Sequence, residues 1–377
     1  MIFPAELYLP QKTLYDAGAL SRVPDECLRL GGRGVVVYGR AFEARMDKWN
    51  AAIARSGCAG NFCMYAYKGG EPALEDVEAL LSFVREKKAE FVCGIGGGSV
   101  MDLAKAGAAL MFAGQPPTAY LYGRPLERAG VPFIAVPTTA GTGAEATVNS
   151  VIINRAAKEK MSIRDDRMIA RAVVLDGTLL DGLPQNVIAE SGMDALTQAI
   201  ESFTANQATD FTRLLALQGF DCVVKHLRAV HVGKRGEAAS ELLLGSYLVG
   251  VALTSSRLGV VHGLAHPLGV LYDLPHGRIC AALLAPAIAL NRTVIETDYR
   301  LLSERAGMDL IEFVEEMNCD LGLSNPFRGK PVIEREKIVA AVLASGSTKA
   351  NPLKIDRAEV ERLMDTVFHL TPPSPLS

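Results

Sequence analysis

The sequence lacks the features that several classes of protein require. Its 377 residues contain no long hydrophobic run and no cluster of lysine or arginine, and 42 acidic residues nearly balance 39 basic ones. A membrane helix needs about 20 uninterrupted apolar residues, and binding along a nucleic-acid backbone needs a basic stripe. We therefore expect neither a membrane nor a nucleic acid as partner, and instead a soluble chain that binds small molecules.

Cysteine is also scarce and scattered. The seven cysteines are odd in number and never occur in C-x-x-C spacing, so neither a disulfide framework nor a cysteine zinc site is indicated. We interpret them as reduced thiols of the core. The N-terminal residues show no basic segment followed by an apolar one, as a secretory signal would. The expected location is the cytoplasm.

Hydrophobic periodicity predicts an α/β half followed by a helical half. Strands are expected at 34–38, 90–94, 132–136 and 172–175, with an amphipathic helix at 74–88, which is the pattern of a parallel sheet. Beyond Leu183 and Pro184 the apolar residues recur every three or four positions, so we place the domains at 1–183 and 184–377. Residues 319–335 are expected to form a loop and 371–377 a loose tail.

A glycine-rich turn indicates a phosphate site. The segment GIGGGSVMDLAK (94–105) follows a predicted strand and opens a helix, and Ser99 and Asp102 have the spacing of a capping box. Backbone N–H groups at Gly97, Gly98 and Ser99 would then point at a pyrophosphate. The alternative is a tight structural turn, since the strict G-x-G-x-x-G pattern is absent.

A second polar loop, PTTAGTGAE (137–145), follows the strand predicted at 132–136. Ligands of open α/β sheets bind outside the carboxyl ends of the strands, so its small hydroxyl residues are candidates for contact with a sugar or phosphate. The alternative is a loop whose hydroxyls cap their own helix.

Histidines gather in the second half. His262 and His266 are four residues apart on one expected helical face, and His276 follows on a turn framed by proline and glycine. Imidazole is a common metal ligand, and a divalent cation also needs a carboxylate. Asp194 is the candidate carboxylate, with Gln198 one helical turn further on.

Together, GGGSVMDLAK, PTTAGTGAE, SGMDALTQAIES and GVVHGLAHPLG followed by LPHG resemble the iron-type (group III) alcohol dehydrogenase family over residues 5–365. The resemblance implies a dehydroquinate synthase-like fold, with an α/β dinucleotide-binding domain, a helical metal-binding domain and a homodimer. It implies hydride transfer between NAD(P) and a small alcohol or aldehyde. The cofactor residues it implies are Gly96, Gly97, Gly98, Ser99, Asp102, Thr138, Thr139, Thr142 and Lys160.

By the same resemblance, the metal ligands correspond to Asp194, Gln198, His262 and His276, and His266 to a residue near the nicotinamide. Gln198 departs from the family, which usually has histidine there, and an amide oxygen is a weaker ligand. We expect Fe²⁺ or Zn²⁺ to be retained on the other three residues. His266 is a candidate for proton transfer because the usual histidine pKa lies near neutral pH, with a packing role as the alternative.

Two further residues bear on specificity. Gly39, followed by Arg40, stands where NAD-preferring relatives tend to carry an acidic residue that repels a 2′-phosphate, so we expect NADPH to be accepted. Arg257 lies shortly before His262 and is a candidate for binding an acidic group of the substrate; the alternative is a solvated arginine. For the whole chain, the alternatives are a dehydroquinate-synthase-like cyclase and a binding protein that lost its metal through Gln198.

Overall fold

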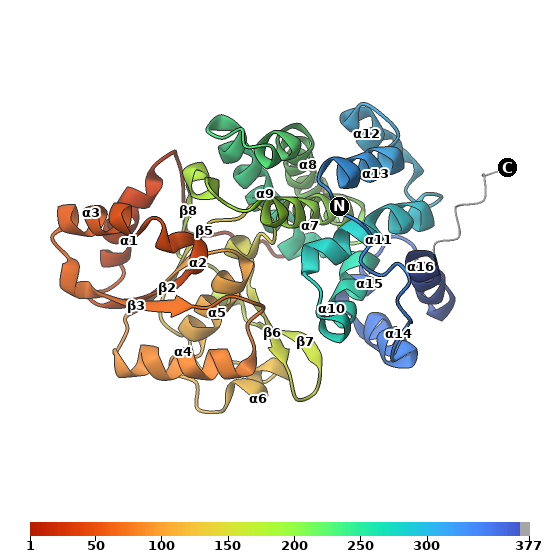
Figure 1. Cartoon of the computed structure of the whole chain (residues 1–377). Helices are drawn as coiled ribbons and strands as arrows, with labels where there is room; N and C mark the ends of the chain where they lie inside the picture. Colours follow the sequence, from red (N-terminus) through yellow and green to blue (C-terminus); the bar gives the residue numbers. More distant parts are fainter. Residues whose placement is uncertain (370–377) are drawn as a thin grey trace.

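The computed structural model describes residues 1–369, so the tail expected at 371–377 lies outside the described residues. An α/β part and a helical part lie side by side, with the sheet on one side of the molecule and α7 to α16 on the other (Figure 1). The N-terminus reaches the helical part, where the main chain of Met1 and Ile2 accepts hydrogen bonds from Asp210 and Phe211. The predicted fold class is confirmed.

The α/β part is built on one sheet of six parallel strands in the order β1-β8-β5-β4-β2-β3. The four predicted strands are present with ends shifted by at most two residues. β1 and β3 were not predicted, because one is short and the other is only half-buried. The strands are β1 Lys12–Tyr15, β2 Gly34–Gly39, β3 Phe62–Tyr67, β4 Phe91–Gly96, β5 Phe133–Pro137 and β8 Ala172–Leu175.

Helices connect these strands. The predicted amphipathic helix is confirmed as α4, whose buried face includes Val77, Leu80, Leu81 and Val84. From β2 the chain goes outward to β3 at the edge of the sheet and then returns to β4 on the other side of β2. The direction in which strands are added therefore reverses between the neighbouring strands β2 and β4. Ligands bind at such a switch point. The helices of this part are α1 Val23–Leu28, α2 Arg40–Glu43, α3 Met46–Ser56, α4 Leu74–Glu86, α5 Gly98–Ala109 and α6 Pro117–Leu121.

An antiparallel hairpin, β6 Asn149–Asn154 and β7 Glu159–Arg164, projects from the α/β part toward α10 (Figure 1). The sequence analysis missed it. Only one of its strands has an apolar centre, and the other alternates charged and polar residues with Met161 and Ile163. The hairpin carries Lys160 to the boundary with the helical part.

The helical part begins at Gln185, and no strand occurs between there and residue 369. The predicted loop is shorter than expected, since α13 continues to Asp320 and α14 begins at Arg335. The helices are α7 Gln185–Thr204, α8 Asp210–His231, α9 Glu237–Ser256, α10 Val260–Tyr272, α11 His276–Asn291, α12 Glu296–Ala306, α13 Leu310–Asp320, α14 Arg335–Ala344, α15 Gly346–Lys349 and α16 Arg357–His369.

The helix α9 is long and apolar enough to cross a membrane by length and composition alone. However, 61% of its apolar window is buried inside the protein, where it packs against α7 and α8. A buried helix of a globular domain accounts for its apolar sequence. The seven cysteines are free as predicted, but they are not all core residues, because Cys319 is exposed and Cys63 half-buried.

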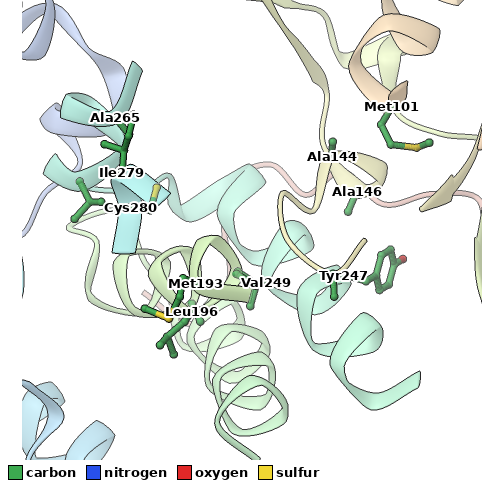
Figure 2. Close-up of a cluster of buried hydrophobic side chains, with 14 of the residues drawn as sticks. Met101, Ala144, Ala146, Met193, Leu196, Tyr247, Val249, Ala265, Ile279 and Cys280 are labelled. Atoms are coloured by element: carbon green, nitrogen blue, oxygen red, sulfur yellow. The ribbon is translucent and has the colours of Figure 1, made fainter. Parts of the chain in front are cut away.

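The helix α9 also forms the seam with the α/β part. A Cβ atom on Gly143 would lie 2.6 Å from Cα of Gly250, so both positions need glycine for the two backbones to approach this closely. Nearby, the Thr254 hydroxyl donates to the Ala146 carbonyl oxygen at 3.2 Å. Figure 2 shows Ala144, Ala146 and Tyr247 on this side of the buried cluster, with Met193, Leu196 and Val249 at the crossing of α7 and α9.

Candidate active site

A cavity of about 740 Å³ lies between the two parts of the molecule. The carboxyl ends of the central strands open toward it from one side, and α7, α10 and α11 line it from the other. Residues of both sides that the sequence singled out line it together: Gly98, Ser99, Asp102, Thr142, Lys160, Asp194, Gln198, Arg257, His262, His266 and His276. The candidate residues of the two halves, far apart in the chain, therefore share one cavity.

The glycine turn stands at the start of α5, as predicted, but the predicted capping box is wrong. The N-cap is Gly97, with no side-chain cap, so Ser99 is already in the first turn. A Cβ atom on Gly98 would lie 2.5 Å from the Thr142 Cγ2 atom, and one on Gly97 would lie 3.1 Å from the Thr139 Oγ1 atom. The glycines therefore let the two predicted cofactor loops touch.

Of the three threonines in the second loop, only Thr142 lines the cavity. The backbone N–H of Thr138 donates to the Gly96 carbonyl oxygen at 2.8 Å, so this residue continues the pairing of β5 with β4, and its side chain is buried. Thr139 packs beside Gly97. Thr138 and Thr139 shape the loop, while Thr142 is placed to contact a ligand.

A fully buried lysine holds this second loop, and the sequence analysis missed it. The Lys105 Nζ atom donates to the carbonyl oxygens of Ala144, Thr147 and Asn149 at 2.5–2.9 Å and to the Thr147 hydroxyl at 3.0 Å. Burial lowers the pKa of Lys105 to about 8. A charged residue in the otherwise apolar stretch LAKAGAAL was the available signal.

Two acidic side chains lie in the surroundings of Lys105. Burial raises the pKa of Asp102 to about 7, although Lys105 opposes this rise. Burial likewise raises the pKa of Glu145 to about 7, and its Oε1 atom has no hydrogen-bond partner. Asp102 lines the cavity, whereas Glu145 belongs to the supporting layer behind the loop.

Of Gly39 and Lys160, only Lys160 lines the cavity. Gly39 ends β2 at the switch point and caps α2, outside the residues that line the cavity. Lys160, on the hairpin, does line the cavity, and its Nζ atom lies 2.5 Å from the Glu71 Oε1 atom. The ion pair fixes the hairpin to the loop that precedes α4.

Side chains from three helices converge at the other end of the cavity. The Asp194 Oδ1 atom lies 3.3 Å from Nε2 of His262 and 3.7 Å from Nε2 of His276. Asp194 and His262 are almost fully buried. The predicted carboxylate and two of the three histidines therefore form a compact set of metal-ligand atoms.

Gln198 and Cys280 adjoin this set. The Gln198 side-chain amide donates from Nε2 to the Asp194 Oδ1 atom at 3.1 Å, while its Oε1 atom is buried without a partner. The Cys280 sulfur lies 3.7 Å from Nε2 of His276, and the ligand atoms of Asp194, His262, His276 and Cys280 all lie within 4.8 Å of one another. The sequence analysis did not name Cys280 as a candidate metal ligand.

Glu201, also missed, orients His262. Its Oε2 atom lies 2.6 Å from the His262 Nδ1 atom, and its Oε1 atom accepts a hydrogen bond from the Val261 backbone at 2.7 Å. Burial opposes a charge on His262, but hydrogen bonds to Asp194 and Glu201 outweigh it and raise the pKa of His262 to about 9. A carboxylate on Nδ1 directs Nε2 toward a metal, as in many metal sites.

His266 and Arg257 lie next to these residues. The rings of His266 and His276 are 5.6 Å apart. Burial, with Lys160 and His262 nearby, lowers the pKa of His266 well below its ordinary value, contrary to the expectation of a pKa near neutrality. Arg257 ends α9 in the left-handed region, with φ of 69°, and its exposed side chain is at the cavity border.

The cavity, with a glycine turn on one side and metal-ligand side chains on the other, fits an enzyme that binds a nucleotide cofactor and a metal ion. Comparisons with known proteins agree. Residues 10–177 match the family "Iron-containing alcohol dehydrogenase", and residues 188–368 match "Fe-containing alcohol dehydrogenase family, C-terminal".

Curated relatives and a solved structure extend the match. The chain is 34% identical over 325 residues to the probable alcohol dehydrogenase EutG of Salmonella typhimurium, covering 84% of this chain and 82% of the relative. It is 30% identical over 381 residues to lactaldehyde reductase of Escherichia coli, covering 96% and 99%. The fold matches sulfoacetaldehyde reductase from Bifidobacterium kashiwanohense in complex with NAD⁺, with a TM-score of 0.87, 23% identity and coverage of 99% and 100%.

The chain belongs to the iron-containing alcohol dehydrogenase family. It is a metal-dependent, NAD-linked oxidoreductase that acts on CH–OH groups and their aldehydes. The cyclase considered from the sequence receives no support from these matches.

Proposed function

We propose that this enzyme reduces small aldehydes that carry an acidic group, with NAD(P)H bound along the glycine turn and a divalent metal held by Asp194, His262 and His276. The observation that carries the proposal is the single cavity in which the ends of both halves meet, with Arg257 at its border. A metal ion bound there would polarise the substrate oxygen as a Lewis acid.

The donor set supports the metal. Asp194 and two imidazole nitrogens converge within hydrogen-bond range or little beyond it, and Glu201 holds the ring of His262 in one orientation. A carboxylate and two imidazoles are ligand types that zinc and iron sites use, and here they are brought together from three helices. This arrangement favours an enzyme over a binder that lost its metal.

The protein's own residues position the reactants. Gly97, Gly98 and Ser99 offer backbone N–H groups at the start of α5 for the pyrophosphate, and Thr142 offers its hydroxyl from the facing loop. His266 lies at the cavity, and burial lowers its pKa well below the ordinary value, which suits its ring to accept a hydrogen bond from a ligand.

The end of β2 favours NADPH. Gly39 stands where an acidic residue would repel a 2′-phosphate, and Arg40 directly after it is exposed. We expect kcat/KM for NADPH to equal or exceed that for NADH, and Arg40→Ala to lower only the NADPH value. Steady-state kinetics with both cofactors tests this. A wild-type preference for NADH of more than about tenfold, or roughly 1.4 kcal/mol, contradicts it.

Two arginines would bind the acidic group of the substrate. Arg257 and Arg164 both line the cavity, and the nearby Asp166 partly offsets the charge of Arg164. Burial, with Arg257 close by, lowers the pKa of Arg164. Two like charges at one wall repel each other unless an anion lies between them, and guanidinium groups bind carboxylates, sulfonates and phosphonates with paired hydrogen bonds.

The test compares charged and neutral aldehydes. Arg257→Ala should cost about 2–4 kcal/mol in kcat/KM for a two-carbon aldehyde bearing a sulfonate or phosphonate, while propanal and butanal should hardly change. Arg257→Lys should restore part of the loss. The matched control is Arg305→Ala. Arg305 is an exposed arginine on α12, outside the cavity lining, and it forms an ion pair with Asp221. Equal losses for charged and neutral aldehydes would make Arg257 structural and the substrate a plain short-chain alcohol or aldehyde.

Location and assembly complete the proposal. We place the enzyme in the cytoplasm, because seven free thiols fit a reducing compartment. We also expect a homodimer. The edge strand β1, which ends at the exposed Tyr15, and the exposed Leu9 before it offer backbone and apolar surface to a second copy. Light scattering coupled to gel filtration measures the oligomeric state.

A further inference from the structure

We propose that Cys280 is the fourth protein ligand of the metal, that Gln198 orients Asp194 rather than binding the metal, and that the site selects zinc over iron. The inference rests on the proposal that Asp194, His262 and His276 hold a metal. It replaces the sequence-based ligand set, in which Gln198 took the fourth place, and the interpretation of all the cysteines as inert core thiols.

The distances among the ligand atoms carry the inference. The Cys280 sulfur lies 3.9 Å from the Asp194 Oδ1 atom and 3.7 Å from the His276 Nε2 atom. The same Asp194 oxygen lies 3.3 Å from His262 Nε2. In tetrahedral zinc sites, with bonds of about 2.3 Å to sulfur and 2.0–2.1 Å to nitrogen or oxygen, neighbouring ligand atoms lie about 3.3–3.6 Å apart. Four of the six pairs of ligand atoms are 3.3–3.9 Å apart and all six lie within 4.8 Å, so a small contraction would bring the set to this geometry.

The local fold explains the position of Cys280. His276 is the first residue of α11 and Cys280 lies one turn further along, so both side chains leave the same face of the helix. Figure 2 shows Cys280 on α11 together with Ile279 and Ala265, in the buried layer where α10 and α11 meet. The ligand-type neighbours of Cys280 are a carboxylate and two imidazoles. Burial and the nearby Asp194 and Glu201 raise the pKa of the thiol, so a bound metal ion would have to displace its proton.

The contacts of Gln198 argue against its being a ligand. Its amide nitrogen donates to the Asp194 oxygen that faces both histidines. An amide N–H₂ group has no lone pair for a metal, so in this orientation Gln198 holds the carboxylate in place. A half-turn of the amide would set its oxygen against the carboxylate oxygen, which is repulsive unless a cation lies between them. If Gln198 were the fourth ligand, its Oε1 atom would bind the metal; if Cys280 is, its sulfur atom does.

The ligand set determines which metal is preferred. A thiolate is a soft ligand and favours zinc over iron relative to a site of carboxylate and imidazoles alone. A thiolate and a carboxylate also neutralise a divalent cation, whereas one carboxylate with three imidazoles leaves one positive charge. The site of this enzyme should therefore combine tight zinc binding with a weaker Lewis acid than the usual family site.

Cobalt substitution provides the readout, because a thiolate bound to Co²⁺ gives an intense near-ultraviolet charge-transfer band that nitrogen and oxygen ligands do not give. Titrating the metal-stripped full-length protein with Co²⁺ should produce this band with one ion per chain. Cys280→Ala and Cys280→Ser should abolish it and weaken zinc binding at least about 100-fold. The control Cys319→Ser, at an exposed cysteine, should keep it. X-ray absorption of the zinc form should show one sulfur at about 2.3 Å.

Variants of Gln198 separate the alternatives. Gln198→Ala should keep the charge-transfer band, and the double variant Cys280→Ala with Gln198→His should regain zinc binding without it. Circular dichroism checks that each variant is folded. A wild-type cobalt spectrum without the band, together with loss of metal in Gln198→Ala, overturns the assignment of Cys280 but keeps the metal site. Metal binding that His262→Ala leaves unchanged, or no binding by the wild type, overturns the proposed site itself.

Discussion

The two walls of the cavity are built from different parts of the chain. On the cofactor side, backbone groups and hydroxyls come from two short segments, and glycines let the loops touch. On the metal side, side chains reach in from α7, α10 and α11, and Glu201 supports His262 while Gln198 supports Asp194. The first wall depends on the space left by missing Cβ atoms, whereas the second depends on particular functional groups.

The largest expected effect is on the metal side of the cavity, called here the metal wall, which carries Asp194, His262 and His276. His262→Ala removes one nitrogen ligand and leaves Glu201 without its partner. We expect loss of bound metal and a fall in kcat/KM of about 10³-fold or more, since Lewis-acid stabilisation is worth several kcal/mol. Elemental analysis and steady-state kinetics measure both. NAD(P)H binding, followed by fluorescence titration, should remain, and a parallel loss of cofactor binding would show that the walls do not act separately.

The next effect concerns the supporting carboxylate. Glu201→Gln keeps the size of the side chain but removes the charge that holds His262. Removing such a partner typically weakens metal binding 10–100-fold, and we expect this range in a competition titration with a chelator. The control is Ser202→Ala, whose hydroxyl donates to the Ala199 carbonyl in its own helix. Unchanged affinity in Glu201→Gln would mean that packing alone holds the ring.

A smaller effect is expected on the cofactor wall. In Gly98→Ala the added Cβ atom meets the Thr142 side chain at 2.5 Å, so the two loops must separate. We expect the KM for the cofactor to rise about tenfold, or about 1.4 kcal/mol, with metal content unchanged. Gly114→Ala is the control, because a Cβ atom there meets nothing within 4 Å. Equal effects in both variants would point to a general effect of replacing a glycine and not to the contact between the loops.

The smallest expected effect is the pH dependence of stability at Glu145. Burial raises the pKa of Glu145 to about 7, opposite Lys105 and near Asp102. Between pH 4.5 and 7 the folded state therefore holds more protons than the unfolded state, and this carboxyl lowers stability as the pH rises. Glu145→Gln should therefore gain stability relative to wild type as the pH rises from 5 to 8. Urea denaturation at both values checks this, and a difference independent of pH contradicts it.

The same contrast explains how much the sequence could predict. The glycine turn and the threonine loop are continuous segments beside strong strands, so their place at the carboxyl ends of β4 and β5 followed from local pattern. The histidine cluster and Asp194 could be named from residue type. Their mutual distances could not, because they depend on how three helices pack.

The residues that escaped prediction act through tertiary contacts. Glu201 and Cys280 each lie in a buried helix, and only the approach of α10 and α11 to α7 makes one an orienting group and the other a neighbour of the ligands. Lys105 holds a loop about 40 residues away in the chain. The hairpin lacked a strong signal because β7 has only two apolar residues among charged and polar ones, most of which line the cavity.

The glycine contact at the seam has a mechanical consequence. Gly143 and Gly250 bring two backbones together with no side chain between them, and Thr254 ties the same place to Ala146. If the cleft widens while these contacts are preserved, the two parts must rotate relative to each other about a hinge at α9. In such a rotation the displacement grows with distance from the hinge. The β6–β7 hairpin, which carries Lys160, would therefore move further relative to the helical part than the residues at the seam.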